Sequence, residues 1–110
     1  MGTKSEIPPG TLYMLILRSL ARMGPMHGYG IAQFIQQTSD DVLQVEEGSL
    51  YPALQRMLIK GWVTGEWKQS DNNRRARYYR LTPEGRKQMS RELDEFERVM
   101  AAIARVIEPA

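Results

Sequence analysis

Residues 48–82 read GSLYPALQRMLIKGWVTGEWKQSDNNRRARYYRLT, a helical pattern followed directly by a basic hairpin. Over residues 48–60 apolar side chains recur at helical spacing, and Gly61 is of the type that ends helices. Residues 62–68 and 76–82 are rich in aromatic and β-branched residues and are separated by a short polar turn. The stretch therefore predicts a helix and then two antiparallel strands.

The predicted helix has two different faces. Leu50, Leu54 and Met57 share one face, at spacings of four and three residues. The other face is polar, and glutamine can pair with adenine, and arginine with guanine, in the major groove. A solvated surface is the alternative, but the adjoining basic hairpin favours DNA. We expect DNA contacts from Ser49, Tyr51, Pro52, Gln55 and Arg56, with the Tyr51 hydroxyl on a phosphate.

The hairpin concentrates positive charge. Residues 68–80 sum to +4, whereas the whole chain of 110 residues carries only +2. Such localised charge can neutralise phosphates and release their counterions, which drives binding to DNA. A solubilising turn is the alternative, and four arginines within residues 74–80 argue against it. Arg80 lies deeper in the return strand, where an ion pair with an acid is equally open. We expect DNA contacts from Lys68, Arg74, Arg75 and Arg77.

The flanking sequence supplies three more helices. They are predicted over about 11–23, from His27 or Gly28 to Thr38, and from Pro83 to about Ile107. Three helices, a hairpin and a last helix predict a mainly α fold, a winged helix-turn-helix with a long C-terminal helix. We expect residues 1–82 to form the DNA-binding domain with a short N-terminal arm, and residues 83–110 to form a dimerisation helix.

The start of the second predicted helix carries the only histidine, His27, in the sequence His27-Gly28-Tyr29-Gly30. A helix N-terminus offers free N–H groups to anions. One histidine without cysteine is a poor metal site, so we interpret His27 as structural or phosphate-facing and include His27 and Tyr29 among the expected DNA contacts. Before the third helix, Glu46 and Glu47 suit a helix N-terminus but would lie near phosphates, and the sequence leaves their role open.

The last helix has a regular apolar seam. Its members follow at spacings of 4, 3, 4, 3 and 4 residues, which is a heptad pattern. The first predicted helix is apolar on nearly every side and so needs cover on two sides. Packing of the last helix on its own domain is the alternative to an intersubunit seam. The expected dimer residues are Leu12, Leu15, Ile16, Met89, Leu93, Phe96, Met100, Ile103 and Ile107.

Four motifs resemble those of the PadR family of bacterial winged-helix transcription regulators. They are HGYG at 27–30, GSLYPAL at 48–54, GWV at 61–63 and RARYYRLTPEG at 75–85, in order over roughly residues 10–107. The chain resembles the short branch of that family, which has one C-terminal helix. The resemblance implies a homodimer that binds operator DNA, usually as a repressor, with possible release by a small molecule or another signal.

The resemblance also implies a place for a small hydrophobic or aromatic effector. In relatives of the short branch, an aromatic in the last helix can stack on flat ligands at the dimer centre. Phe96 falls at about that place, with Met100 beside it and Tyr13 and Leu17 as expected partners from the first helix. A stripe of Phe and Met is more often core than a ligand site, so a filled dimer core is the alternative.

Composition excludes several classes of protein. The chain has no cysteine and one histidine, and it lacks a glycine-rich nucleotide loop after a strand. We therefore expect no enzyme activity, no cofactor and no metal. No apolar run approaches the roughly 20 residues of a membrane helix, so we expect a cytoplasmic protein. A winged-helix adaptor for other proteins is the alternative function, although such a module would not need this positive charge.

Overall fold

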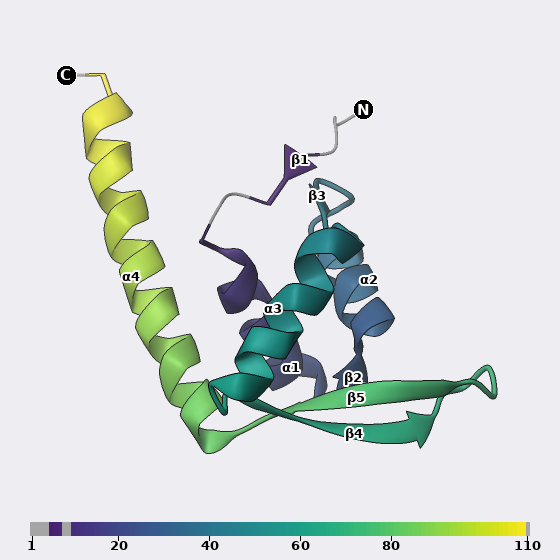
Figure 1. Cartoon of the computed structure of the whole chain (residues 1–110). Helices are drawn as coiled ribbons and strands as arrows, with labels where there is room; N and C mark the ends of the chain where they lie inside the picture. The colour runs from purple at the N-terminus through teal and green to yellow at the C-terminus, as the bar shows by residue number, and fades with distance from the viewer. Residues whose placement is uncertain (1–4, 8–9, 110) are drawn as a thin grey trace.

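A computed structural model describes residues 5–7 and 10–109 of the chain, and most of the expected N-terminal arm lies outside these residues. The expected order of three helices, a hairpin and a last helix is confirmed, and the fold is a mainly α winged helix (Figure 1). The helices are α1 (Leu12–Met23), α2 (Gly28–Thr38), α3 (Glu47–Ile59) and α4 (Pro83–Ile107). The strands are β1 (Ser5–Glu6), β2 (Met26–His27), β3 (Leu43–Gln44), β4 (Val63–Gln69) and β5 (Arg75–Leu81).

The wing is the hairpin of β4 and β5, residues 63–81. Its strands are antiparallel, with Val63 opposite Leu81 at the base and Gln69 opposite Arg75 near the tip. The short strand β2, which the sequence did not predict, pairs with the other edge of β5 and gives a sheet of order β2-β5-β4. Because β2 leads directly into α2, this pairing ties the start of the helix-turn-helix to the wing. At the other end of the domain, β1 pairs in parallel with β3.

The core lies where the three helices meet the base of the wing. It is formed by one face of each helix and by the inner face of the wing, as the helical and strand periodicities predict. Met89, from the first part of α4, closes it. The largest fully buried side chains are Ile16, Leu17, Ile31, Leu50, Leu54, Met57 and Val63.

Helix α1 is covered within its own chain, contrary to our expectation. It packs against α2, α3, α4 and β5, so its several apolar sides all find partners inside one domain. Ile16 and Leu17 are fully buried in this core. Ile16 is therefore a core residue and not part of a dimer surface, and Leu17 cannot line an accessible effector site. Leu12 and Leu15 remain half-buried on the same helix.

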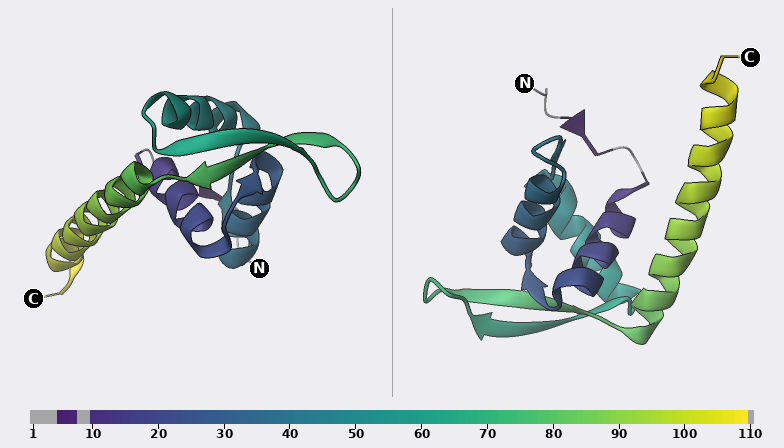
Figure 2. Two further views of the ribbon diagram at one scale, coloured as in Figure 1. Left: turned by 90° about the horizontal axis from the view of Figure 1, so that it is seen from below. Right: turned by 180° about the vertical axis from the view of Figure 1, so that it is seen from behind.

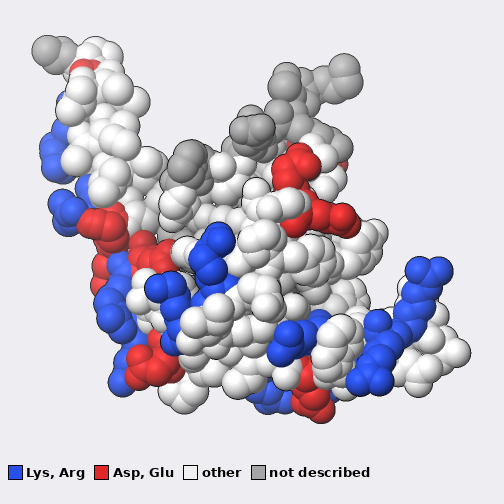
Figure 3. Space-filling model, in the orientation of Figure 1, with Lys and Arg blue, Asp and Glu red and all other residues white. Residues whose placement is uncertain are grey.

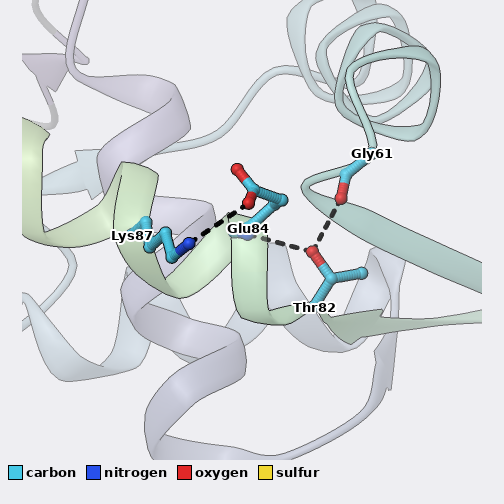
Figure 4. A network of polar contacts seen from close by, with 5 residues as sticks. Gly61, Thr82, Glu84 and Lys87 are labelled. Atoms are coloured by element: carbon cyan, nitrogen blue, oxygen red, sulfur yellow. Dashed lines mark hydrogen bonds and ion pairs between the residues drawn. The ribbon is translucent and has the colours of Figure 1, made fainter.

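The start of α4 is fixed to the junction of α3 and β4 (Figure 4). The Thr82 hydroxyl accepts a hydrogen bond from the Gly85 N–H at 2.9 Å and donates one to the Gly61 carbonyl at 2.7 Å. A Cβ at Gly85 would lie 2.7 Å from Leu81 Cδ1 and closer still to the Trp62 carbonyl oxygen. The absence of a side chain at position 85 therefore lets α4 begin against the backbone of the α3–β4 junction.

Helix α4 then leaves the body of the domain (Figures 1 and 2). Met89 is buried and Leu93 is half-buried against the core, but most apolar side chains from Phe96 onward are exposed. No helix in the described part of the chain combines the length and apolar character needed to cross a membrane. The projecting half of α4 is thus amphipathic, with one apolar side that this chain does not cover.

Candidate nucleic-acid interface

The face of the wing that packs on the core at its base continues outward beyond the body of the protein. Side chains alternate between the two faces of a strand, so the residues of one face follow at every second position. At the base this face is buried, as at Val63, whereas farther out it is open, and Trp67 is 56% exposed. The cross-strand pairs of this face are, from base to tip, Val63 and Leu81, Gly65 and Tyr79, Trp67 and Arg77, and Gln69 and Arg75.

A groove of about 660 Å³ lies between this face of the wing and the start of α2. Tyr51, from the first turns of α3, closes its inner end. The groove therefore joins all three parts of a winged helix that usually meet DNA. Its principal lining residues are His27, Tyr29, Gln33, Tyr51, Trp67, Arg74, Arg75, Arg77 and Tyr79.

Tyr51 holds α3 close to the start of α2. A Cβ at Gly28 would lie 2.7 Å from Cε1 of the Tyr51 ring and 2.9 Å from its hydroxyl oxygen. Glycine at position 28 thus lets the phenol rest directly on the helix start. The Tyr51 side chain remains 43% exposed, so one side of the ring packs and the other faces the groove. The phosphate contact expected for its hydroxyl stays a prediction.

His27 is the N-cap of α2. Its Nδ1 accepts a hydrogen bond from the Gly30 N–H at 3.0 Å, which satisfies one of the free donors at the helix start. The imidazole lies edge-on to the Tyr78 ring, with 5.2 Å between centroids. The structural interpretation of His27 therefore has direct support, while a phosphate contact by His27 stays a prediction. Tyr29 is two-thirds exposed beside the groove.

The arginines at the outer part of the wing form no ion pair with a carboxylate in the described part of the chain. The ion pairs found among residues 5–7 and 10–109 are Lys87 with Glu84 and Arg98 with Glu95, both on α4. The guanidinium of Arg75 lies 5.4 Å from the centroid of the Trp67 ring, a cation–π contact. Figure 3 shows Lys and Arg atoms gathered over the end of the wing. This surface therefore carries a net positive charge, since its three arginines outnumber its one acid, Asp71.

Two basic residues of the wing face away from the groove. Lys68 and Arg80 occupy the other face of the strands, where Lys68 lies over the Tyr78 ring at 5.5 Å. The alternation of strand side chains places them there, one residue out of step with Trp67 and Tyr79. Lys68, which we expected at DNA with the arginines, does not line the groove with them. Arg80 forms no ion pair among the described residues, so the pairing we left open for it is not observed.

On α3 the predicted base-contacting residues separate into two groups. Gln55, Ser49 and Pro52 are exposed and unobstructed on the outer surface. Arg56 is turned toward α1, where its Nε donates a hydrogen bond to the Tyr13 hydroxyl and its guanidinium lies 5.7 Å from the Tyr13 ring. Five residues of helix place Arg56 about 140° around α3 from Tyr51, whereas Gln55 lies within about 40° of Tyr51. Ser49 lies within about 20° of Arg56 on the helix, so Gln55 is the nearer of these polar residues to the groove.

Tyr13, the partner of Arg56, also contacts the base of the wing. Its ring meets the Trp62 ring edge-on, with 5.5 Å between centroids, so Tyr13 links α1 to α3 and to the base of the wing. The sequence had placed Tyr13 beside Phe96 in an effector site. The structure gives its hydroxyl and its ring other partners within the chain.

The projecting half of α4 exposes an apolar stripe. Phe96 is 38% exposed and Val106 83% exposed, and both lie on helix that the domain does not cover. Met89, which we expected in the dimer seam, instead packs into the core of its own domain. Val99 and Val106 were missed, although each lies three residues after a seam member. The stripe consists of Phe96, Val99, Met100, Ile103, Val106 and Ile107.

Trp67 and Gln33 are further lining residues that sequence reasoning did not select. For Trp67 the signal was present, because strand alternation places it on the face of Val63. For Gln33 the signal was its position one helical turn after Tyr29.

At the other end of the domain, Asp40, Asp41, Glu46 and Glu47 are exposed, and acidic atoms gather around β3 in Figure 3. Within residues 5–7 and 10–109, no group of His, Asp and Glu side chains is arranged to hold a metal.

Comparison with known proteins agrees with this geometry. The family model "Transcriptional regulator PadR-like family" matches residues 16–91. Uncharacterized protein X of Lysinibacillus sphaericus is 28% identical over 100 residues, which cover 91% of each chain.

Solved structures are similar over nearly the whole chain. A transcriptional regulator from Clostridium thermocellum has a TM-score of 0.82 and 28% identity, covering 90% of this chain and 95% of that one. A PadR family transcription regulator from Clostridium difficile has a TM-score of 0.76 and 27% identity, covering 90% of this chain and all of that one. The residues matched by the family model include α2, α3 and both strands of the wing, which line the groove.

Proposed function

The chain belongs to the transcriptional regulator PadR-like family, and from this membership we propose that it represses transcription by binding an inverted-repeat operator as a homodimer. The observation that carries the proposal is the groove, which joins the start of α2, Tyr51 of α3 and the unpaired arginines of the wing. The cations of this surface all lie on the wing and form no ion pair among the described residues, which suits the phosphate backbone of DNA.

DNA contact divides between the two sides of this surface. Arg74, Arg75 and Arg77 on the wing supply positive charge, which binds any duplex with similar strength. Ser49 and Gln55, which are both exposed on α3, supply hydrogen-bonding groups for base edges. We assign Arg56 to neither group, because its guanidinium is engaged by Tyr13. Sequence preference should therefore depend more on Gln55 than on Arg56.

Dimerisation is supported by the exposed stripe of α4. Six large apolar side chains on one projecting helix form a surface that a soluble domain rarely leaves open. A second copy of the same helix offers a complementary apolar face, and a twofold pair is the commonest arrangement. We propose the stripe as the dimer surface, together with the half-buried Leu93, Leu12 and Leu15. Such a dimer presents two copies of α3, about 34 Å apart on one side of the duplex.

An effector at the dimer centre remains a smaller proposal. Phe96 and Met100 belong to the stripe and are accessible in the single chain, so a flat hydrophobic ligand can reach them before or during dimerisation. Leu17 is removed from this site by its burial, and Tyr13 by its contacts with Arg56 and Trp62. A ligand there would act by favouring one spacing of the two α3 helices.

Selection of duplexes from a random pool tests the proposed function. We expect enrichment of an inverted repeat whose half-site centres lie about one helical turn apart. The control is the same selection with the variant Arg74→Ala/Arg75→Ala/Arg77→Ala, which should enrich weakly or not at all. Enrichment of a single asymmetric site would contradict the dimer. A wild-type protein that enriches nothing and binds no duplex at low salt would favour the adaptor function instead.

A further inference from the structure

Arg77 lies flat against the neighbouring strand at a place where that strand has no side chain. A Cβ built on Gly65 would lie 3.0 Å from Cζ and 3.1 Å from Nη2 of Arg77, and closer still to its Nε. The strand partner of Gly65 is Tyr79, so the Arg77 side chain reaches diagonally toward the base of the wing. We call this arrangement the arginine seat. It exists because position 65 is glycine.

The seat holds a positive charge that forms no ion pair within residues 5–7 and 10–109. The Nε of Arg77 is buried and has no hydrogen-bond partner among the described residues. Arg77 also forms no ion pair there, since the two pairs of the described chain lie on α4. An unpaired arginine at a protein surface usually extends its long side chain into water, where every N–H is solvated. Leaving a charged donor partly desolvated costs free energy that an arriving anion can offset.

The surroundings of the seat include a further potential donor. The groove that it lines also contains one acid, Asp71, which forms no ion pair among the described residues. Burial raises the pKa of the Tyr79 hydroxyl, and the nearby charge of Arg77 opposes that rise. Arg77, Tyr51 and Tyr79 all line the groove, and the electrostatic influence of Tyr51 also raises the pKa of Tyr79, so the three side chains lie near one another. The hydroxyl of Tyr51 is held there by its close approach to Gly28.

We propose that the arginine seat is a phosphate-binding site, in which the terminal nitrogens of Arg77 and the Tyr51 hydroxyl together hold one phosphate group. Gly65 is then a positioning residue for DNA binding, since it fixes the guanidinium without touching the ligand. A planar guanidinium can grip two phosphate oxygens at once, which a lysine cannot do. The inference rests on the proposed function for its natural ligand, a backbone phosphate of duplex DNA, while a free phosphate shares the same chemistry.

The decisive variant is Gly65→Ala, which keeps every charge and removes the seat. Gly65 is not among the glycines with positive φ, so alanine is compatible with its backbone, and a strand accepts alanine readily. We expect Gly65→Ala and Arg77→Ala each to weaken duplex binding about tenfold. The double variant should bind no more weakly than Arg77→Ala, because both changes remove one interaction. Arg80→Ala, on the opposite face of the same strand, is the matched control and should bind within about twofold of wild type.

Thermal unfolding confirms that each variant is folded. Duplex affinity of folded Gly65→Ala equal to that of wild type would overturn the inference. So would additive losses in the double variant, which would show that residues 65 and 77 act separately.

A second measurement separates this inference from the proposed function and identifies the source of the phosphate. The Arg77 Nε–H signal is followed by ¹H–¹⁵N NMR while inorganic phosphate, and separately a 20-base-pair duplex, is added. A shift with both ligands in wild type, lost in Gly65→Ala, assigns the seat to phosphate of either source. A shift with the duplex alone assigns it to the DNA backbone. If wild type binds no duplex but phosphate shifts Arg77, the seat stands and the DNA function fails. No shift with either ligand overturns the seat.

Discussion

At the scale of single residues, Trp67 has the clearest unassigned role. It lies on the outer part of the wing, is more exposed than buried, and supports the Arg75 guanidinium from one side. An exposed cation–π contact contributes about 0.5–1 kcal/mol, mainly by restricting where the arginine points. Trp67 therefore helps to hold Arg75 at the mouth of the groove, where a phosphate or the wall of a minor groove would meet it.

Replacement of Trp67 by alanine should weaken duplex binding about two- to fivefold, the equivalent of losing that contact. Thr64→Ala is the control, because Thr64 is exposed and pairs with Arg80 on the opposite face of the wing. Both are measured by fluorescence anisotropy with one labelled duplex. Equal losses in the two variants would contradict the assignment of the DNA face to the side of Trp67.

Gln55 and Arg56 are adjacent in sequence but should behave differently. Gln55→Ala removes a group that faces outward from α3, so the preference for operator over random duplex should fall by roughly 1–3 kcal/mol. Arg56→Ala removes a side chain engaged by Tyr13 and should change that preference by less. Competition assays with operator and random duplexes measure both. A larger loss of preference in Arg56→Ala would restore our original sequence-based assignment.

The direction of Arg56 could not be predicted from the sequence. Helical periodicity put it correctly on the polar side of α3, but its partner, Tyr13, is 43 residues away. Lys68 is a similar case: its charge is evident in the sequence, but the face of the wing on which it lies is not. Its face depends on which alternating set of wing residues packs on the core, and Val63 decides that. Residue types and elements were thus predictable, whereas orientation within each element required the packed structure.

At the scale of elements, the junction of β5 and α4 determines where the last helix points. Gly85→Ala introduces a Cβ that collides with the Trp62 backbone and with Leu81 Cδ1. Because backbone cannot move aside cheaply, the free energy of unfolding should fall by about 1–3 kcal/mol or more. Gly48→Ala is the control, since a Cβ there meets nothing within 4 Å, and its effect should be neutral or slightly stabilising. Urea denaturation measures both, and equal stability of the two variants would contradict this account.

Two helices show how far elements could be predicted. The apolar character of α1 was read correctly, but its cover comes from α2, α3, α4 and β5, a tertiary arrangement that no local pattern specifies. Along α4 the heptad spacing is the same from Met89 to Ile107. The first part nevertheless packs on its own domain and the rest projects, because Gly85 and Thr82 anchor only one end of the helix.

At the scale of the whole molecule, the projecting stripe of α4 predicts self-association. Ile103→Glu places a charge in the centre of the stripe and should convert a dimer into a monomer at micromolar concentration. Ala101→Glu adds the same charge on the opposite side of the helix, where it should leave the dimer intact. Sedimentation velocity measures the masses. A monomeric wild type, or loss of the dimer in both variants, would contradict the proposed surface.

A positive cluster and a negative cluster of charged residues lie at different ends of the molecule. Cations gather at the wing, and four acidic residues, Asp40, Asp41, Glu46 and Glu47, lie exposed around β3 and the start of α3. Neither Glu46 nor Glu47 forms an ion pair among the described residues. Their position at the helix start stabilises α3 through its dipole. Their charge would repel phosphates there, so DNA should approach from the side of the wing.

The salt dependence of duplex binding tests whether the wing and α3 form the DNA interface. Affinity is measured over a range of salt for wild type and for Arg74→Ala/Arg75→Ala/Arg77→Ala. The matched control removes three exposed α4 cations, Arg86→Ala/Arg91→Ala/Arg105→Ala. Each arginine that meets a phosphate contributes about one to the slope of log affinity against log salt. We predict a slope shallower by about three per protomer for the wing variant and nearly unchanged for the control. Equal slopes for wild type and the wing variant would contradict the account.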